Sequence, residues 1–209
     1  MAKNFAEIAF SPASKTIQAQ MGSREAYERM EKNSQFEGLT EREMKFIASR
    51  DSFYMATVGE NDYPYIQHRG GPKGFLKVFD SQRIGFLDFK GNMQYVSVGN
   101  LMTNEKVSLF LMDYPTKTRL KIYAKTELVD LNEDDGLYDF LSLKNYSARP
   151  ERMMIFHIEA FDWNCPQHIT TRYTLPEIEE MAKKQREYIS KLEAEINTLK
   201  FELERKNAQ

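Results

Sequence analysis

The stretch SFYMATVGENDYPYIQHRGGPKGFLKVFDSQRIGFLDF, residues 52–89, decides the fold. Short runs rich in aromatic and β-branched residues, such as SFYMATVG, YPYIQHRG and RIGFLDF, alternate in it with turn signals such as Gly59-Glu60-Asn61-Asp62 and Asp80-Ser81-Gln82. Runs of this kind are typical of β-strands, and glycine, asparagine and aspartate between them are typical of tight turns. The stretch therefore predicts antiparallel strands joined by short connections.

The same alternation of strand-like runs and turn signals continues to residue 163. Further strand-like runs are KVSLFLMDY, RLKIYAKTELVD and RMMIFHIEAF, and two helices are expected in NMQYVSVGNLMTN and NEDDGLYDFLSLKN. About seven strands at this close spacing favour an antiparallel barrel or sandwich over a parallel sheet with crossover helices. We therefore expect a mainly β (α+β) fold, with helices at the periphery.

Residues 1–50 have a helical pattern that ends where the first strand begins. Ser11 can cap a helix that starts at Pro12, and Ser23 can start a second helix, SREAYERMEK. The sequence Thr40-Glu41-Arg42-Glu43 is a capping box, which predicts a third helix ahead of MKFIA. We expect this N-terminal segment to pack on a barrel domain formed by residues 51–174.

The remaining residues, 175–209, predict one long helix. From about Pro176 to Lys206 apolar residues recur in alternating steps of four and three, with Ile189 and Ile196 at heptad position a and Leu192 and Leu199 at position d. Branched residues at a with leucine at d favour a parallel two-stranded coiled coil. Packing of the helix against the chain's own core is the alternative, but a strongly charged helix of this length favours self-association.

Composition excludes several classes of function. The formal net charge of −2 provides no general attraction to nucleic acid or to an anionic membrane. The single cysteine, Cys165, cannot form an intramolecular disulfide, and neither a signal peptide nor an apolar run of about 18 residues is present in the sequence. We therefore expect a cytoplasmic protein.

Common catalytic and nucleotide motifs are absent from the sequence. It has no GxGxxG, GxxxxGK[ST], HExxH or CxxC pattern, and its three histidines are too scattered to predict a metal site. His157 lies within an apolar strand run, so we expect it to be a core histidine. Cys165 and His168 could form a nucleophilic pair, but Pro166 lies between them and no third orienting group is evident. We name no catalytic residue.

Three polar segments are candidates for ligand binding. In QHRGGPKGFLKVFD, Arg69 and bare glycine N–H groups could bind a phosphate or ring carbonyls, and glycine would allow a planar ligand to lie on the backbone; a solvated glycine-rich hairpin is the alternative. In FLDFKGNMQYVSVGNL a strand ends at Asp88 and a helix begins near Asn92, which offers a helix N-terminus to a phosphate or a simple cap. In FDWNCPQHITTRY, the indole of Trp163 can pack against a planar ligand ring. The guanidinium of Arg172 can donate hydrogen bonds to carbonyl or phosphate oxygens.

These segments, together with SFYMATVGENDYPYIQHRGGPKGFLKVFD, LFLMDYPTKTRLKIY and the N-terminal AFSPASKTIQAQMGSREAYERME, resemble the flavin-nucleotide-binding relatives of pyridoxamine 5'-phosphate oxidase. The resemblance runs from about Phe10 to Tyr173. It implies an antiparallel split β-barrel that forms a homodimer, with one FMN in each of two clefts at the subunit interface. Haem or a deazaflavin would be the alternative cofactor, with His68 or His168 as the axial ligand of a haem.

The resemblance also implies where FMN contacts lie. Gln67, His68 and Arg69 come from one strand, Asp88, Asn92 and Gln94 from the strand-to-helix turn, and Arg119 from the long strand that follows. Trp163 and Arg172 resemble the tryptophan–arginine pair that closes over the flavin, and Lys77 matches the lysine of the oxidase's RxVLLK motif. That list of ten residues is the expected cofactor site.

Two departures from the oxidase bear on activity. The RxVLLK motif is PKGFLK here, so that Pro72 stands where the oxidase has arginine, and Asn92-Met93-Gln94 replaces its basic pair for the FMN phosphate. They argue against pyridoxamine 5'-phosphate oxidation. We expect an FMN-dependent oxidoreductase that passes hydride from a reduced nicotinamide to an unknown acceptor, with a small-molecule substrate. A non-catalytic flavin-binding or sensing module with a docking tail is the alternative.

Overall fold

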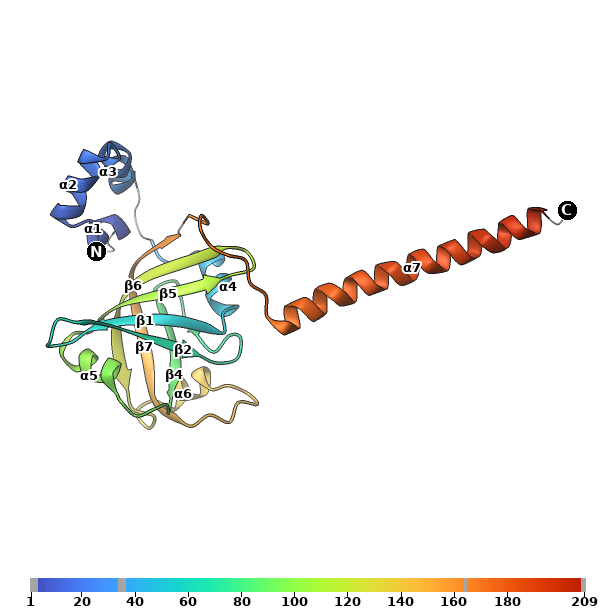
Figure 1. Cartoon of the computed structure of the whole chain (residues 1–209). Coiled ribbons are helices and arrows are strands. Elements are labelled where there is room, and N and C mark those ends of the chain that lie inside the picture. The colour runs from blue at the N-terminus through green and yellow to red at the C-terminus, as the bar shows by residue number, and fades with distance from the viewer. Residues whose placement is uncertain (1–3, 34–36, 164, 208–209) are drawn as a thin grey trace. The chain divides into compact units, whose positions relative to one another are not determined.

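The computed structural model describes residues 4–33, 37–163 and 165–207. Within them, seven strands form one antiparallel sheet in the order β2-β1-β5-β6-β7-β4-β3 (Figure 1). The strands are β1 Ser52–Val58, β2 Pro64–Gly70, β3 Lys77–Val78, β4 Arg83–Phe89, β5 Lys106–Asp113, β6 Thr118–Val129 and β7 Pro150–Trp163. The helices are α1 Phe5–Ala9, α2 Pro12–Gln20, α3 Arg24–Asn33, α4 Glu41–Ala48, α5 Val96–Thr103, α6 Asp135–Leu141 and α7 Leu175–Asn207.

The sheet curls on itself into a split barrel. In the strand order β2 forms one edge and β4 lies next to the other edge. Nevertheless Nη1 of Arg69 on β2 lies 2.6 Å from Oδ1 of Asp88 on β4, so the two ends of the sheet meet. Side chains close this gap instead of a backbone ladder. The mainly β (α+β) split barrel expected from the sequence is confirmed.

Alternation of apolar residues along the strands builds the barrel core. Phe53 and Met55 of β1 and Leu109 and Leu111 of β5 are fully buried, and the residues between them are not. A cluster of four phenylalanines fills the interior: Phe53, Phe75, Phe86 and Phe156, with ring centroids 5.4–6.1 Å apart. Each such ring contributes a large buried apolar area, which makes this cluster a main source of stability.

The strand β4 is covered on both of its faces. Ile84 and Phe86 face the barrel core, whereas Leu87 packs in a second cluster with Leu141 of α6 and Met153 of β7. The continuous apolar run IGFL follows from this double burial. The helix α6, expected from the sequence, is therefore the outer cover of β4.

The strand expected in FLKVFD is much shorter than its sequence pattern. Only Lys77 and Val78 pair with β4, because Phe75 and Leu76 instead insert their side chains into the core. The N–H of Phe75 donates to the carbonyl oxygen of Pro72 at 2.9 Å, which makes a turn before the strand.

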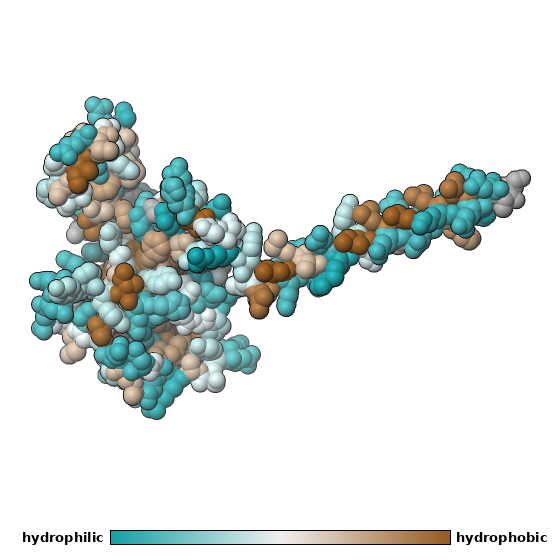
Figure 2. All heavy atoms as spheres, in the orientation of Figure 1, coloured by the Kyte–Doolittle hydropathy of each residue, from teal (hydrophilic) through white to brown (hydrophobic). Residues whose placement is uncertain are grey.

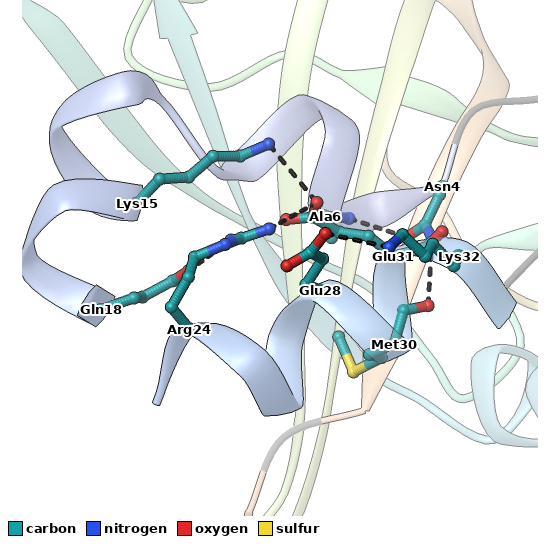
Figure 3. A network of polar contacts seen from close by, with 9 residues as sticks. All are labelled: Asn4, Ala6, Lys15, Gln18, Arg24, Glu28, Met30, Glu31 and Lys32. Carbon is teal, nitrogen blue, oxygen red and sulfur yellow. Dashed lines mark hydrogen bonds and ion pairs between the residues drawn. The ribbon is translucent and has the colours of Figure 1, made fainter. Parts of the chain in front are cut away.

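The N-terminal helices α1, α2 and α3 are joined by a polar network (Figure 3). Its centre is Glu31 of α3, which accepts from Nη2 of Arg24 at 2.7 Å and from Nζ of Lys15 at 3.4 Å. Asn4 donates to the carbonyl oxygen of Glu31 at 2.8 Å, and its side chain also caps α1. The Ser11 cap and the helix starting at Pro12 are confirmed. The five-residue α1 was not anticipated from the sequence; its Phe5 ring stacks on Tyr123 of β6 with centroids 4.9 Å apart.

The expected capping box at Thr40 is present and does more than cap α4. Glu43 is buried, and its Oε2 accepts from the backbone N–H of Thr40 at 3.0 Å. Its Oε1 accepts from Nε1 of Trp163 at 2.6 Å, at the end of β7. The ring of Trp163 also meets that of Phe46 edge-on, with centroids 4.9 Å apart. Glu43 therefore ties α4 to the sheet.

His157 was expected in the core, and that expectation is wrong. Its side chain is 46% exposed and lies on an outward-facing position of β7, where Nε2 is 2.8 Å from Oε2 of Glu127. The run RMMIFHIEAF does not show which residues alternate outward, because the outward-facing Ile155 is also apolar and is covered by the second cluster.

The chain divides into two compact units: residues 1–113 with 117–168, and residues 114–116 with 169–209. The second unit contains α7, a helix of 33 residues in which no residue is buried. The long helix expected from the sequence is confirmed, within one residue at each end. No helix in the described part of the chain is both long and apolar enough to cross a membrane.

Candidate functional site

A small pocket lies at one end of the barrel, where β2, β4, β7 and the start of α5 meet. Because side chains alternate along a strand, Tyr65, Gln67 and Arg69 of β2 all face it. Asp88 at the end of β4 lies at its base, being only 3% exposed. The pocket is therefore built from strand segments far apart in sequence, which only the curled sheet brings together.

Asp88 holds the floor of the pocket in place through two arginines. Oδ1 accepts from Nη1 of Arg69 at 2.6 Å, and Oδ2 accepts from Nη1 of Arg152 on β7. A carboxylate taken out of water needs such partners, and two guanidinium groups supply them. Each arginine uses only part of its N–H groups to contact Asp88, so both retain N–H groups that can donate to other partners.

Arg69 is itself almost buried, with 11% of its side chain exposed. Burial lowers the pKa of Arg69, against the opposing effect of the Asp88 carboxylate, but arginine stays charged at any physiological pH. Its Nε is buried and has no hydrogen-bond partner among the described residues. A buried donor without an acceptor is costly, and a ligand oxygen would satisfy it.

A β-bulge directs two successive residues of β7 toward the pocket. Asp88 pairs with Arg152 and Phe89 pairs with Pro150, so Glu151 is an extra residue in the ladder. Successive strand residues normally face opposite sides, but the bulge lets both Glu151 and Arg152 line the pocket. Bulges are frequent next to binding sites for this reason.

The turn between β4 and α5 forms the rim. Met93 and Tyr95 have φ angles of 59° and 52°, a left-handed conformation that bulky residues rarely adopt. The helix was expected to begin near Asn92, but it begins at Val96, because Oδ1 of Asn92 accepts from the N–H of Gln94 at 3.2 Å and makes a turn of its own. Asn92 is therefore not the helix cap.

The first turn of α5 is also part of the pocket wall. Its N-cap residue, Tyr95, makes no side-chain capping hydrogen bond, so the N–H groups of Val96, Ser97 and Val98 lack the acceptor that a Ser, Asp or Asn cap would supply. The hydroxyl of Ser97 donates to Oε1 of Gln67 at 2.8 Å, which fixes α5 to β2.

The position of α5 is fixed on its other side by Gly59. A Cβ on Gly59 would lie 2.1 Å from Oδ1 of Asn100, whose Nδ2 donates to Oγ1 of Thr57 at 3.0 Å. Glycine at this position leaves room for the Asn100 side chain against the β1–β2 turn. The N-terminal end of α5 is thereby directed at the pocket.

Tyr95 and Glu151 close the side of the pocket away from β2. The Tyr95 hydroxyl donates to Oε1 of Glu151 at 3.0 Å, and this hydrogen bond raises the pKa of Tyr95. Oε2 of Glu151 lies 3.3 Å from Nη2 of Arg152, whose guanidinium also lies over the Tyr95 ring at 5.5 Å. The four charged side chains lining the pocket, two arginines and two carboxylates, thus cancel in formal charge.

Half of the expected cofactor residues meet in this pocket. Five of them line it together: Gln67, Arg69, Asp88, Asn92 and Gln94. The other five do not belong to its lining.

Each of those five residues has another place in the structure. His68 faces outward on β2 next to Tyr54, and Lys77 lies half-buried on β3. Nη2 of Arg119 donates to the carbonyl oxygen of Cys165 at 3.3 Å. Trp163 binds Glu43, and the guanidinium of Arg172 lies 5.0 Å over the ring of Tyr114 in the second unit.

The glycine-rich segment Gly70-Gly71-Pro72-Lys73-Gly74, expected to support a planar ligand, is absent from the pocket lining. The N–H of Gly71 donates to Asp51 and that of Gly74 to Arg50, both through backbone carbonyl oxygens at 2.9 and 3.1 Å. Gly74 has a φ of 80°, which explains the glycine. These glycines shape the connection between strands.

Sequence reasoning missed Tyr95, Ser97, Glu151 and Arg152. A signal for Arg152 existed: Asp88 stands in the otherwise apolar stretch IGFLDF, residues 84–89, and therefore needs a cation nearby. Which cation that is depends on the pairing of β4 with β7 and on the bulge, neither of which can be read from one sequence. Within the described residues no group of three or more His, Cys, Asp and Glu side chains could hold a metal ion.

Comparison with known proteins gives one family match. The family model for pyridoxamine 5'-phosphate oxidase matches residues 39–163, which is more than half of the chain. No curated protein sequence matches this chain significantly.

Several solved structures are similar at low sequence identity. HupZ of Group A Streptococcus is 14% identical, with 65% of this chain and 100% of that chain covered and a TM-score of 0.49. A putative pyridoxamine 5'-phosphate oxidase from Lactobacillus delbrueckii is 22% identical, with coverages of 60% and 93% and a TM-score of 0.46. An FMN-binding protein from Syntrophomonas wolfei is 20% identical, with coverages of 71% and 97% and a TM-score of 0.46.

Proposed function

Since the chain belongs to the pyridoxamine 5'-phosphate oxidase family, we propose that it binds FMN and that the pocket at Arg69 holds the phosphate. The observation that carries this proposal is the buried Nε of Arg69, which has no acceptor among the described residues. The N–H groups of the first turn of α5 lie in the same pocket, and a helix N-terminus favours an anion. Donors from β2, α5 and β7 would then surround one phosphate.

The charge balance decides how the phosphate would be held. Because Asp88 and Glu151 offset Arg69 and Arg152, the pocket has no excess positive charge to attract an anion from a distance. Binding would depend instead on oriented N–H and O–H donors at short range. This differs from the oxidase, whose basic pair is replaced here by Asn92-Met93-Gln94.

The size of the pocket supports a homodimer. Its cavity volume is about 40 Å³, whereas sites for ligands of FMN's size usually measure roughly 300–1,000 Å³. We propose that a second copy supplies the missing walls around the flavin ring. The outer face of β1 and β2 exposes Tyr54, Ile66 and His68, with Ile66 65% exposed, and such a patch suits a protein interface.

The bound flavin would supply the redox chemistry, and the protein would supply orientation and electrostatics. The proposed reaction passes hydride from a reduced nicotinamide to an unknown small-molecule acceptor, in the cytoplasm. Arg119, Trp163 and Arg172 remain proposed flavin contacts, in addition to the pocket residues. The family name suggests pyridoxamine 5'-phosphate oxidation, but Pro72 in place of the motif's arginine argues against it.

A non-catalytic FMN-binding module is the second candidate. Every charged side chain in the pocket is engaged in an ion pair or hydrogen bond with another: Arg69 and Arg152 with Asp88, and Glu151 with Tyr95. None of them is poised as a general acid or base. Purified protein that binds FMN but consumes reduced nicotinamide no faster than free FMN would favour the module.

The first test is a titration of the purified chain with FMN and with riboflavin, which lacks the phosphate. We expect quenching of flavin fluorescence and an affinity for FMN at least tenfold above that for riboflavin, because the phosphate would form charge-assisted hydrogen bonds. Equal affinities would contradict a phosphate seat, and no binding of either flavin would contradict the proposal. A Soret band in the purified protein would indicate haem instead.

Replacing Arg152 by methionine should weaken FMN binding about 10- to 100-fold and leave riboflavin binding nearly unchanged, since one charge-assisted hydrogen bond is worth about 1.5–3 kcal/mol. The matched control is Arg83→Met on β4, where the arginine is 52% exposed and paired with Asp80 outside this pocket. FMN and riboflavin affinities are measured for both variants at a temperature where both are folded. If Arg152→Met and Arg83→Met behave alike, Arg152 does not contact the phosphate.

A further inference from the structure

The helix α7 has an apolar stripe of exposed side chains, interrupted at one heptad position by Gln185. None of its residues is buried, and Figure 2 shows hydrophobic side chains recurring along its length. Six of these are 40–60% exposed: Ile178, Ile189, Leu192, Ile196, Leu199 and Leu203. A stripe at heptad spacing needs a partner helix to remove it from water.

The charged residues beside the stripe indicate in which direction two such helices can pair. With Ile189 at position a and Leu192 at position d, the e positions are Glu179, Arg186, Glu193 and Lys200. The charge alternates in sign along this edge of the helix. The g positions on the other edge are Met181, Tyr188, Glu195 and Glu202, which do not alternate.

An antiparallel pair of α7 helices matches this alternation in one register. In antiparallel coils, a residues face d residues of the partner, and e positions face e positions. If Ile189 lies opposite Leu192 of a second copy, Glu193 lies beside Arg186 and Glu179 beside Lys200 of that copy. By symmetry each pair occurs twice, which gives four opposite-charge contacts.

The same register fixes the facing residues at the other a and d positions: Ile178 faces Leu203, and Gln185, the polar residue among them, faces Ile196. Ala182 faces Leu199, which places a small side chain against a large one. The g edge joins Met181 with Glu202 and Tyr188 with Glu195, so no like charges meet. The helices overlap over almost the full length of α7, from Leu175 to Asn207.

The competing arrangements fit less well. If one antiparallel helix is shifted by one heptad in one direction, Glu193 lies against Glu193 and Arg186 lies against Lys200 of the second copy. A shift by one heptad in the other direction places Arg186 against Arg186 and Glu179 against Glu193. A parallel pair brings only Glu195 beside Lys200, twice per dimer. The a and d residue types alone favour the parallel coil, whereas the flanking charges favour the antiparallel one.

We propose that α7 pairs with α7 of a second copy of this chain as an antiparallel coiled coil in which Ile189 faces Leu192. The occupant of the stripe is therefore another copy of the same protein. The proposal uses only α7 and does not depend on any bound cofactor.

Cross-linking of full-length protein tests the direction of the helices. Cys165 is the sole cysteine of the sequence and is exposed, and it is changed to serine to give a background free of thiols. In this background Ala182→Cys and Leu199→Cys are made singly and together, and treated with a short bis-maleimide. The two positions are 17 residues apart in the chain, about 25 Å along a helix, so one helix cannot link to itself.

We expect the double variant to form a covalent dimer and each single variant to stay uncross-linked on a denaturing gel. Cross-linking of the single variants would show a parallel pair and overturn the proposal. The absence of any cross-link in all three would also overturn it, because the stripe would then face something other than a second copy. Circular dichroism of each variant checks that the helix is retained.

Charge reversal tests the register. In the double-cysteine background, Glu193→Arg or Arg186→Glu alone should raise the protein concentration for half-maximal cross-linking about tenfold, since two attractive contacts per dimer become repulsive. Both reversals together should restore the original value. In a parallel pair these residues face Tyr188 and Met181, so single changes of less than twofold, without rescue, would contradict the register.

Discussion

Replacement of Asp88 by asparagine is expected to lower the free energy of unfolding by about 3–5 kcal/mol, the largest effect of any single change away from the apolar core. Asparagine keeps the shape of the side chain but removes its charge. Arg69 would then be left as an almost buried cation without its carboxylate partner, and the partly buried Arg152 would keep only Glu151. Urea unfolding measures the loss, and thermal unfolding should show a midpoint roughly 6–20 °C lower.

The matched control for Asp88→Asn is Glu105→Gln. Glu105 forms an ion pair with Lys125, but both side chains are about half exposed, so the loss should be much smaller than that for Asp88→Asn. Comparable losses in the two variants would show that burial of Asp88 does not matter. A triple variant, Arg69→Met with Asp88→Leu and Arg152→Met, should be more stable than Asp88→Asn, because no buried cation is left without Asp88 and Glu151 keeps its hydrogen bond from Tyr95.

Replacement of Glu43 by alanine should cost about 2–4 kcal/mol, the second large effect. The change removes the helix cap partner of Thr40 and leaves the indole N–H of Trp163 without its acceptor. Glu41→Ala is the control: it lies in the same helical turn but forms only an exposed pair with Lys45, worth about 0.3–0.5 kcal/mol. Chemical unfolding of both variants at neutral pH makes the comparison, and equal losses would contradict the tie between α4 and β7.

The pH dependence of stability gives an independent check on Glu43. Burial alone would raise the pKa of Glu43, but hydrogen bonds from Thr40 and Trp163 outweigh it and hold that pKa below its ordinary value of 4.5. A carboxyl with a lowered folded-state pKa stabilises the fold fully above its unfolded pKa and loses that contribution as pH falls through the folded value. Glu43→Gln should therefore flatten the decline in stability below about pH 4.5, and an unchanged slope would contradict this role.

Much of the fold follows from local patterns. The strands β1, β4, β5 and β6 were expected within one or two residues, because alternating apolar side chains such as Phe53 and Met55 mark one face of a strand. The same reasoning wrongly predicted that His157 is a core residue, since the second cluster around Leu87 also buries residues on the outer face of β7. A pattern of apolar residues does not distinguish a strand covered on one side from one covered on both.

The site was less accessible to sequence reasoning. Gln67, Arg69 and Asp88 were identified because polar groups stood out in strand contexts and matched the family's phrases. Arg152 was missed because its place depends on the pairing of β4 with β7 and on the bulge at Glu151. Single-sequence patterns contain local periodicity, whereas register is a property of two strands together.

The closure of the barrel by side chains has a consequence for its motions. Between β2 and β4 no backbone ladder resists separation; the ion pair of Arg69 with Asp88 spans the gap, and β2 is held by ladder hydrogen bonds to β1 alone. If that ion pair breaks, β2 can move away from β4 only by bending about its ladder with β1 and against the Ser97–Gln67 hydrogen bond to α5, while β1 and the β5-β6-β7-β4 part of the sheet keep their ladders. This seam between β2 and β4 runs through the floor of the pocket, so an opening of the barrel wall at the seam would also expose the proposed phosphate site.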